Sequence, residues 1–265
     1  MQDPDERFEL LPGSAHLFFS IGFIRDVSMK EIRVSANSLE PIGQNTWTQR
    51  YDGTEICDFV STAIGDSLRI TVHAGTPGAP ILYVLDSVIL FDLAVGVANL
   101  LRTAALFTGD PFPSLTIVGV GYSTKDPGTV FASRARDLTP TDGALNTVVP
   151  LPPLAFGGAP AFLDALADEV VPLVESRYNT DPSRRALAGV SFGGLFALYA
   201  LFHRPGIFTG YVIGSPSLWW DDGIASRWEE TWANEQSDMA ARVFLSVGGN
   251  EQTVGGHLEK RGLPA

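Results

Sequence analysis

Ser191 lies in the pentapeptide GVSFG, residues 189–193, and is the residue best suited to covalent chemistry in this chain. Residues 185–190 have the composition of a short buried strand, and residues 194–202 that of an apolar helix. A serine on so sharp a strand-to-helix turn presents its hydroxyl at the edge of a sheet, and flanking glycines avoid clashes with the turning backbone. The pattern in this setting predicts a nucleophile for acyl transfer. The alternative is a structural turn that happens to contain serine.

A nucleophilic serine also needs a base and an orienting carboxylate, which follow it in the order acid, then histidine, in sheets of this kind. Glu251 follows the strand pattern of residues 242–247 and is the predicted acid. Asp221 and Asp222, just past the preceding strand, are the second choice. Alternatively, these two carboxylates lie in solvent at the start of a helix, where the helix dipole favours negative charge.

Backbone N–H groups near the serine are expected to bind the oxyanion that forms during acyl transfer. The N–H of Phe192 directly follows the nucleophile and is the first predicted donor. The second donor is expected from the loop after the apolar run of residues 79–86, at Ser87 or Val88.

The base is the component that the sequence does not supply in the expected place. His16, His73 and His203 all precede Glu251, and His203 is expected to cap the end of the helix after the nucleophile. His257 follows Glu251 by only six positions, fewer than the ten to twelve or so that a helical crossover requires. We therefore expect His257 on a surface loop, and the base beyond a final strand and helix in a protein some tens of residues longer.

Strand and helix patterns alternate through most of the chain, which predicts an α/β fold with a mostly parallel sheet and right-handed crossovers. The N-terminal third is β-rich, and the later elements alternate. The expected strands are residues 17–23, 30–36, 56–62, 67–73, 79–86, 115–121, 185–190, 210–214 and 242–248, and the expected helices are residues 91–106, 158–174, 194–202 and 223–236. We expect a single domain over residues 1–265, with residues 1–55 as a β-rich extension and residues 122–160 as a lid-like loop.

Two groups of side chains are candidates for substrate contacts. Trp219 and Trp220 are predicted to frame the acyl or alcohol pocket, with plain core packing as the equal alternative. Arg134 and Arg136 have the charge to bind a substrate carboxylate, although a structural ion pair with Asp137 is favoured.

The charge balance excludes some partners. With 30 acidic and 18 basic residues the net charge is −12, which argues against a nucleic-acid partner, since such partners need a basic face. Cys57 is the single cysteine, so no intramolecular disulfide is possible. The acidic N-terminus lacks a signal core, and no run of about 18 apolar residues predicts a membrane span. These features favour a cytoplasmic location and no membrane partner.

The chain resembles the esterase D-like branch of the α/β hydrolases, and looks most like its enterobactin-type trilactone esterases. The resemblance runs from about residue 59 to 251 and rests on six blocks: LYVLD at 82–86, VGVGY at 118–122, RDLTP at 136–140, GGA with FL at 157–163, GVSFGGL at 189–195 and SPSLWW at 215–220. It implies an α/β-hydrolase fold and hydrolysis of small soluble esters or siderophore-type lactones through an acyl-serine, without metal or cofactor.

The same resemblance assigns Ser191 as nucleophile, Glu251 as acid and Val88 as an oxyanion donor. One departure is the turn at residues 85–87, which reads Leu-Asp-Ser where the family has Leu-Asp-Gly. A non-glycine residue is thus expected to take the glycine's backbone conformation. Two other functions stay open: a non-catalytic binding protein on a hydrolase scaffold, and acyl transfer to an acceptor other than water.

Overall fold

The computed structural model describes residues 47–51, 53–143, 154–236 and 238–249. All of them fall in the second of two compact units into which the chain divides, Met1–Pro41 and Ile42–Ala265. The strands predicted at 17–23 and 30–36, together with His16, Glu251 and His257, lie outside the described residues.

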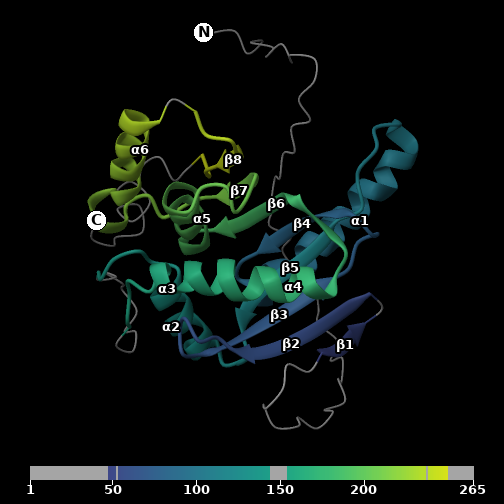
Figure 1. Ribbon diagram of the computed structural model, residues 1–265, viewed down its shortest axis with the longest axis horizontal. Coiled ribbons are helices and arrows are strands. Elements are labelled where there is room, and N and C mark those ends of the chain that lie inside the picture. Colours follow the sequence, from purple (N-terminus) through teal and green to yellow (C-terminus); the bar gives the residue numbers. More distant parts are fainter. Residues whose placement is uncertain (1–46, 52, 144–153, 237, 250–265) are drawn as a thin grey trace, which may run out of the picture. The chain divides into compact units, whose positions relative to one another are not determined.

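The described part of the chain forms one eight-stranded sheet in the order β1-β2-β3-β5-β4-β6-β7-β8 (Figure 1). The strands are β1 Trp47–Tyr51, β2 Thr54–Val60, β3 Ser67–His73, β4 Ala79–Val84, β5 Thr116–Tyr122, β6 Thr180–Val190, β7 Gly210–Gly214 and β8 Arg242–Ser246. β1, β2 and β3 pair antiparallel, and β3 pairs antiparallel with β5. From β5 through β8 all pairs are parallel, which confirms the predicted sheet with its antiparallel N-terminal portion.

Helices cover both faces of this sheet. They are α1 Ser87–Thr108, α2 Pro127–Asp137, α3 Ala159–Asp164, the π-helical segment Ala165–Val170, α4 Val171–Arg177, α5 Phe192–His203, the 3₁₀ turn η2 Trp220–Asp222 and α6 Ile224–Glu235. Successive strand residues point to opposite faces, so Tyr83 and Val84 of β4 enter different cores. Val84 packs with Phe91 of α1 in one apolar cluster, whereas Tyr83 packs with residues of α3 to α5 in the other.

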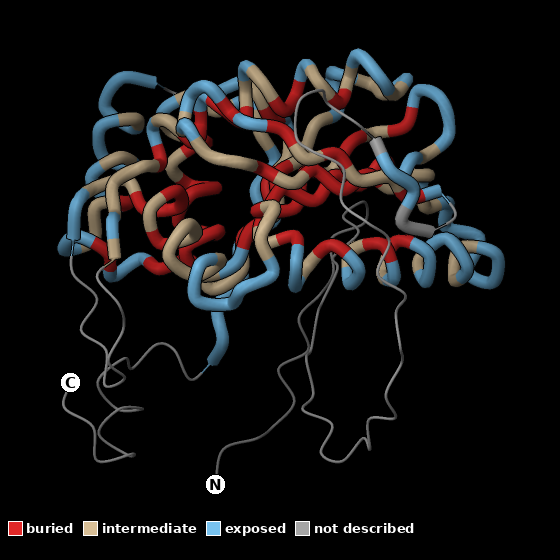
Figure 2. Tube along the Cα trace, turned by 90° about the horizontal axis from the view of Figure 1, so that it is seen from below, coloured by how far each residue is buried: buried red, intermediate tan, exposed pale blue. Residues whose placement is uncertain are grey.

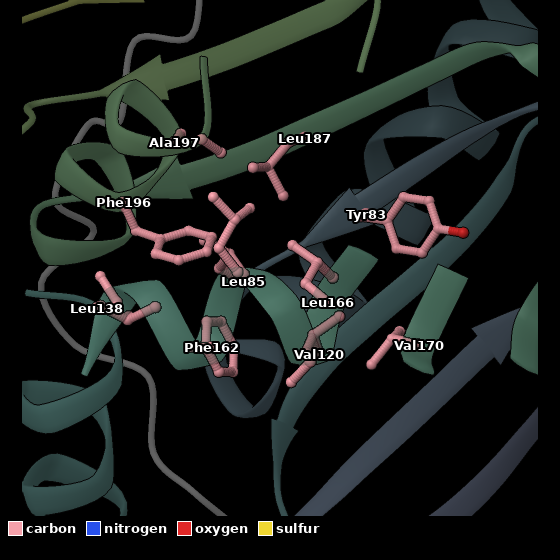
Figure 3. Close-up of a cluster of buried hydrophobic side chains, with 14 of the residues drawn as sticks. Tyr83, Leu85, Val120, Leu138, Phe162, Leu166, Val170, Leu187, Phe196 and Ala197 are labelled. Atoms are coloured by element: carbon pink, nitrogen blue, oxygen red, sulfur yellow. The ribbon is translucent and has the colours of Figure 1, made fainter. Parts of the chain in front are cut away.

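The larger core joins the sheet to the helix that runs from α3 to α4 (Figure 3). Phe162, Leu166 and Val170 recur every four residues along it and are all buried, so they form one apolar stripe. Phe196 of α5 meets Phe162 edge to face, with ring centroids 5.1 Å apart. Figure 2 shows the buried residues running between the helical layers, with exposed residues on the outer turns. This packing fixes the strands whose ends carry the candidate site.

The segment of residues 122–160 is not the irregular loop that the sequence predicted, because α2 lies within it. A signal for this helix is present in the sequence. The Asp126 carboxylate accepts a hydrogen bond from the Thr129 N–H at 2.8 Å, and Pro127 occupies the first turn. Both are favoured at helix starts. The short, polar composition of α2 concealed its apolar periodicity.

α1 differs from its prediction in length and in apolarity. It begins at Ser87, four residues before the expected start. Asp92 and Arg102 are its only charged residues, so by length and composition α1 is apolar enough to span a bilayer, and only 17% of its most apolar stretch is buried. A criterion of about 18 unbroken apolar residues does not identify α1, because these two charged residues interrupt the run. Phe91 and Val95 pack α1 against Val84 of β4 and Ile117 of β5 in the smaller apolar cluster.

The strand and helix expected after β8 have no counterpart among the described residues. Among the described strands, β8 forms the edge of the sheet, and its residues Val243, Phe244 and Leu245 are exposed.

Candidate active site

Ser191 occupies the turn between β6 and α5 with a strained backbone, φ 60° and ψ −117°. L-residues other than Asn and Asp rarely adopt positive φ, and such strain persists only where surrounding bonds fix it. Here the Ser191 N–H donates to the Gly214 carbonyl at 3.0 Å, and its carbonyl accepts from Leu195 at 2.9 Å and Ser217 at 3.1 Å. The predicted sharp turn is therefore present, with the serine at its apex.

Gly189 is required for this turn. A Cβ atom at this position would lie 2.2 Å from the carbonyl oxygen of Gly193, closer than any van der Waals contact allows. The first and last residues of the pentapeptide thus touch through their backbones. This close approach gives the G-x-S-x-G spacing a direct steric cause.

The turn between β4 and α1 lies beside the nucleophile, because β4 and β6 are adjacent parallel strands. Its left-handed residue is Asp86, with φ 53°. Ser87 begins α1 and has no positive φ, so a non-glycine residue fits the backbone at this position. The serine side chain fits because Gly121 lies opposite: a Cβ there would meet Ser87 Oγ at 2.3 Å. The space for the Ser87 side chain is thus left by a glycine of β5, which the sequence around Ser87 could not show.

Both predicted oxyanion donors lie in first helical turns. Phe192 is the first residue of α5, and Val88 is the second residue of α1. N–H groups in the first turn have no partner within the helix, and they lie at the positive end of the helix dipole. Since β4 and β6 are neighbours, two such helix starts lie at the same edge of the sheet as Ser191.

An ion pair joins the two turns. The Arg134 Nε donates to Asp86 Oδ1 at 2.7 Å, and Nη2 donates to the Val190 carbonyl at 3.2 Å. The guanidinium also lies 5.2 Å from the centroid of the Phe192 ring. Burial raises the pKa of Asp86, while the Arg134 charge and hydrogen bond oppose that rise. A cation is therefore held directly beside the nucleophile turn.

The sequence did not predict this pair, since Asp86 and Arg134 lie 48 positions apart. Arg136, in contrast, pairs with Asp137 at 2.6 Å as favoured, and also with Asp66 at 3.0 Å.

The two predicted tryptophans have different environments. Trp220 is only 2% exposed, its ring lies edge to face on Phe192, and its indole N–H donates to Thr141 Oγ1 at 3.0 Å. A ring without free surface cannot contact a substrate, so Trp220 packs the core. Trp219 is 52% exposed and lies 6.2 Å from the Phe192 ring. Its contact with a substrate stays a prediction.

The described histidines are engaged elsewhere. His203 ends α5, stacks on Tyr199 and bonds to its carbonyl at 3.0 Å, in agreement with the capping prediction. It lies about 18 Å along the helix from Ser191 at 1.5 Å per residue. His73 ends β3 and bonds to Thr54 at 3.1 Å.

Asp221 and Asp222, the second choice for the acid, lie in η2. Asp221 is 3.5 Å from Arg227 of α6. Glu251 lies outside the described residues, but β8 pairs in parallel with β7, so the chain leaves β8 at the edge that carries Ser191. Among the described residues, no group of three His, Cys, Asp or Glu side chains lies together to hold a metal ion.

A serine at a strained strand-to-helix turn, at the carboxyl edge of a mostly parallel sheet covered on both faces, defines an α/β hydrolase. The chain belongs to the family described as "Putative esterase", which matches residues 61–263. It is 39% identical over 152 residues to the siderophore triacetylfusarinine C esterase of Aspergillus fumigatus, a region covering 56% of this chain and 48% of that protein. It is 29% identical over 183 residues to the ferri-bacillibactin esterase BesA of Bacillus subtilis, covering 66% and 61%.

Among solved structures, the BES protein from Bacillus cereus superposes with a TM-score of 0.66 at 28% identity, covering 81% of this chain and 84% of that one. The chain thus spans about half the length of one curated relative and three fifths of the other.

Proposed function

We propose that this protein is a serine carboxylesterase that cleaves esters through an acyl-serine intermediate on Ser191. The observation that carries the proposal is the strained backbone of Ser191, which three backbone hydrogen bonds hold in place. Ser191 lies at the sheet edge where α1 and α5 begin. Strained residues that surrounding bonds hold in place cluster at active sites. Family membership supports the same chemistry.

In the proposed reaction, Ser191 Oγ attacks the ester carbonyl carbon while its proton passes to a histidine base. The carbonyl oxygen becomes an oxyanion, for which the N–H groups of Phe192 and Val88 are the proposed donors. Collapse expels the alcohol with that proton, and water then attacks the acyl-serine by the same route. Arg134 adds positive charge beside the site, although its Nε and Nη2 already hold Asp86 and Val190.

Glu251 is the proposed acid, because the chain leaves β8 at the correct edge of the sheet. The base is assigned to a histidine outside the described residues, since His73 and His203 are bonded elsewhere. His257 is the alternative base within this sequence.

The proposed substrates are small soluble esters, including siderophore-type lactones. One relative is named as a siderophore triacetylfusarinine C esterase and another as a ferri-bacillibactin esterase. Exposed Trp219 at the site supplies an apolar and aromatic surface for an acyl or alcohol group.

A fluorophosphonate probe tests the proposal, because it reacts with an activated serine and not with an ordinary one. We expect one equivalent bound per chain, no labelling of Ser191→Ala, and hydrolysis of p-nitrophenyl acetate that this variant loses. Loss of the triad serine in comparable enzymes costs on the order of a million-fold in rate. Products formed with added alcohols would separate hydrolysis from acyl transfer. A protein that neither binds the probe nor turns over the ester is a binding protein on this scaffold.

A further inference from the structure

A second hydroxyl lies next to the candidate nucleophile. Ser217 Oγ is 3.4 Å from Ser191 Oγ, and either oxygen is able to donate. Ser217 is only 4% exposed. A buried hydroxyl needs a hydrogen-bond partner, and here that partner is the atom proposed to attack the substrate.

The loop between β7 and η2 fixes Ser217 in this place through its backbone. The Ser217 N–H donates to the Ser191 carbonyl at 3.1 Å, and the Ser217 carbonyl accepts from the Trp220 N–H at 3.1 Å. Pro216 packs against the first turn of α5, where a Cβ on Gly194 would lie 3.0 Å from its Cα. Because these contacts use the backbone, they hold whichever side chain occupies position 217.

We propose that the Ser217 hydroxyl donates a hydrogen bond to Ser191 Oγ and stabilises the negative charge that this oxygen carries in the acyl-transfer transition states. The inference rests on the proposed function. Ser191 gives its own proton to the base and keeps lone pairs free to accept from Ser217. Ser217 keeps its proton throughout.

The bond acts in both halves of the reaction. In acylation, the Ser191 Oγ–carbon bond forms as the Oγ proton leaves. In deacylation, that bond breaks and Oγ leaves with its electron pair before it regains a proton. A hydrogen bond to an ionised oxygen is shorter and about twice as strong as one between neutral groups. Catalytic hydrogen bonds in unliganded enzymes are often long and tighten in the complex, as a resting distance of 3.4 Å allows.

The measurement is the second-order rate of fluorophosphonate labelling, together with kcat and KM for p-nitrophenyl acetate. In Ser217→Ala we expect labelling and kcat to fall by roughly 10- to 100-fold, the worth of one hydrogen bond to a charged group. KM should stay unchanged, because the hydroxyl bonds the nucleophile rather than the substrate.

Three further variants separate the hydroxyl from packing. Ser217→Thr keeps the donor and should recover most of the rate. Ser217→Cys keeps the approximate volume with a weaker donor and should stay slow. Ser226→Ala removes an exposed hydroxyl of α6 and should label like the wild type. Thermal unfolding of each variant checks the fold, and if the alanine variant does not fold, the Cys and Thr pair decides.

Wild-type labelling rates in Ser217→Ala, or equal losses in the Thr and Ala variants, would overturn the role of the hydroxyl. A wild-type protein that is not labelled at all would instead refute the proposed function.

Discussion

The carboxylate of Asp86 and the guanidinium of Arg134 form a 2.7 Å ion pair that joins the turn after β4 to the nucleophile turn after β6. The side chains are 10% and 17% exposed, so water screens the pair only weakly. Asp86 is the left-handed residue of one turn, and Arg134 donates to the carbonyl of Val190, directly before Ser191, in the other. The pair therefore ties together the two turns that carry the proposed oxyanion donors.

Removing the cation should leave a buried carboxylate without a partner. We predict that Arg134→Met lowers the free energy of unfolding at pH 7 by about 3 kcal/mol. Urea denaturation measures this, and the double variant Asp86→Asn with Arg134→Met should recover most of the loss. If the single and double variants are equally unstable, the ion pair is not the cause.

The same variant has a predicted pH dependence. Burial already makes the folded-state pKa of Asp86 higher than in the unfolded chain, so the folded protein binds that proton more tightly. The free energy of unfolding from this group therefore falls as pH rises from the ordinary carboxyl pKa to the raised one. Without Arg134 the pKa rises further, so the variant should be closest to wild-type stability at acidic pH and fall behind as pH increases.

Gly189→Ala should destroy the nucleophile turn, because the new Cβ has no room beside the Gly193 carbonyl. Fluorophosphonate labelling of Ser191 should be lost, with a fall in thermal stability. Gly96→Ala is the matched control: it lies within α1 with nothing within 4 Å of the added Cβ, and should stabilise by up to about 1 kcal/mol. Normal labelling of Gly189→Ala would contradict the steric account.

The fit between Ser87 and Gly121 predicts a compensating pair. Gly121→Ala places a Cβ 2.3 Å from Ser87 Oγ and should cost roughly 1 to 3 kcal/mol, as overpacking does. Adding Ser87→Gly removes the clashing atoms, and the remaining neighbour is Ser87 N at an ordinary 3.7 Å. Thermal unfolding of both single variants and the double variant measures the coupling. Additive losses would show that the two side chains do not compete for one space.

The tryptophans should separate binding from stability. Trp220→Ala removes a buried ring and should cost roughly 3 to 5 kcal/mol, whereas Trp219→Ala, half exposed, should leave unfolding nearly unchanged and raise KM for aromatic esters. The comparison of KM values with aromatic and acetyl esters tests the second part. Equal KM values in wild type and Trp219→Ala would remove Trp219 from the binding site.

Cys57 should be inert in the native protein. It is fully buried, and burial raises the pKa of its thiol to about 11, so the thiolate that reacts is scarce at pH 8. Iodoacetamide should modify it only after unfolding by urea. Rapid modification of the folded protein would show that β2 opens to solvent.

Local patterns in the sequence determined the succession of most strands and helices along the chain, the turn at Ser191 and the capping role of His203. Hydrophobic periodicity, glycine sterics and helix-end chemistry all act within a few residues of each other, so a short window contains them. β3 and β7 accordingly match their predicted bounds, and α2 was missed because its polar face and short length left little periodicity.

Only the tertiary structure decided which distant residues meet. It pairs Arg134 with Asp86 rather than with Asp137, buries Trp220 while exposing Trp219, and makes room for Ser87 with a glycine on another strand. These outcomes depend on the strand order β5-β4-β6-β7, which places residues tens of positions apart within contact distance. Spacing along the chain carries no record of that order, because each parallel crossover can return its strand to either side of the strand before it.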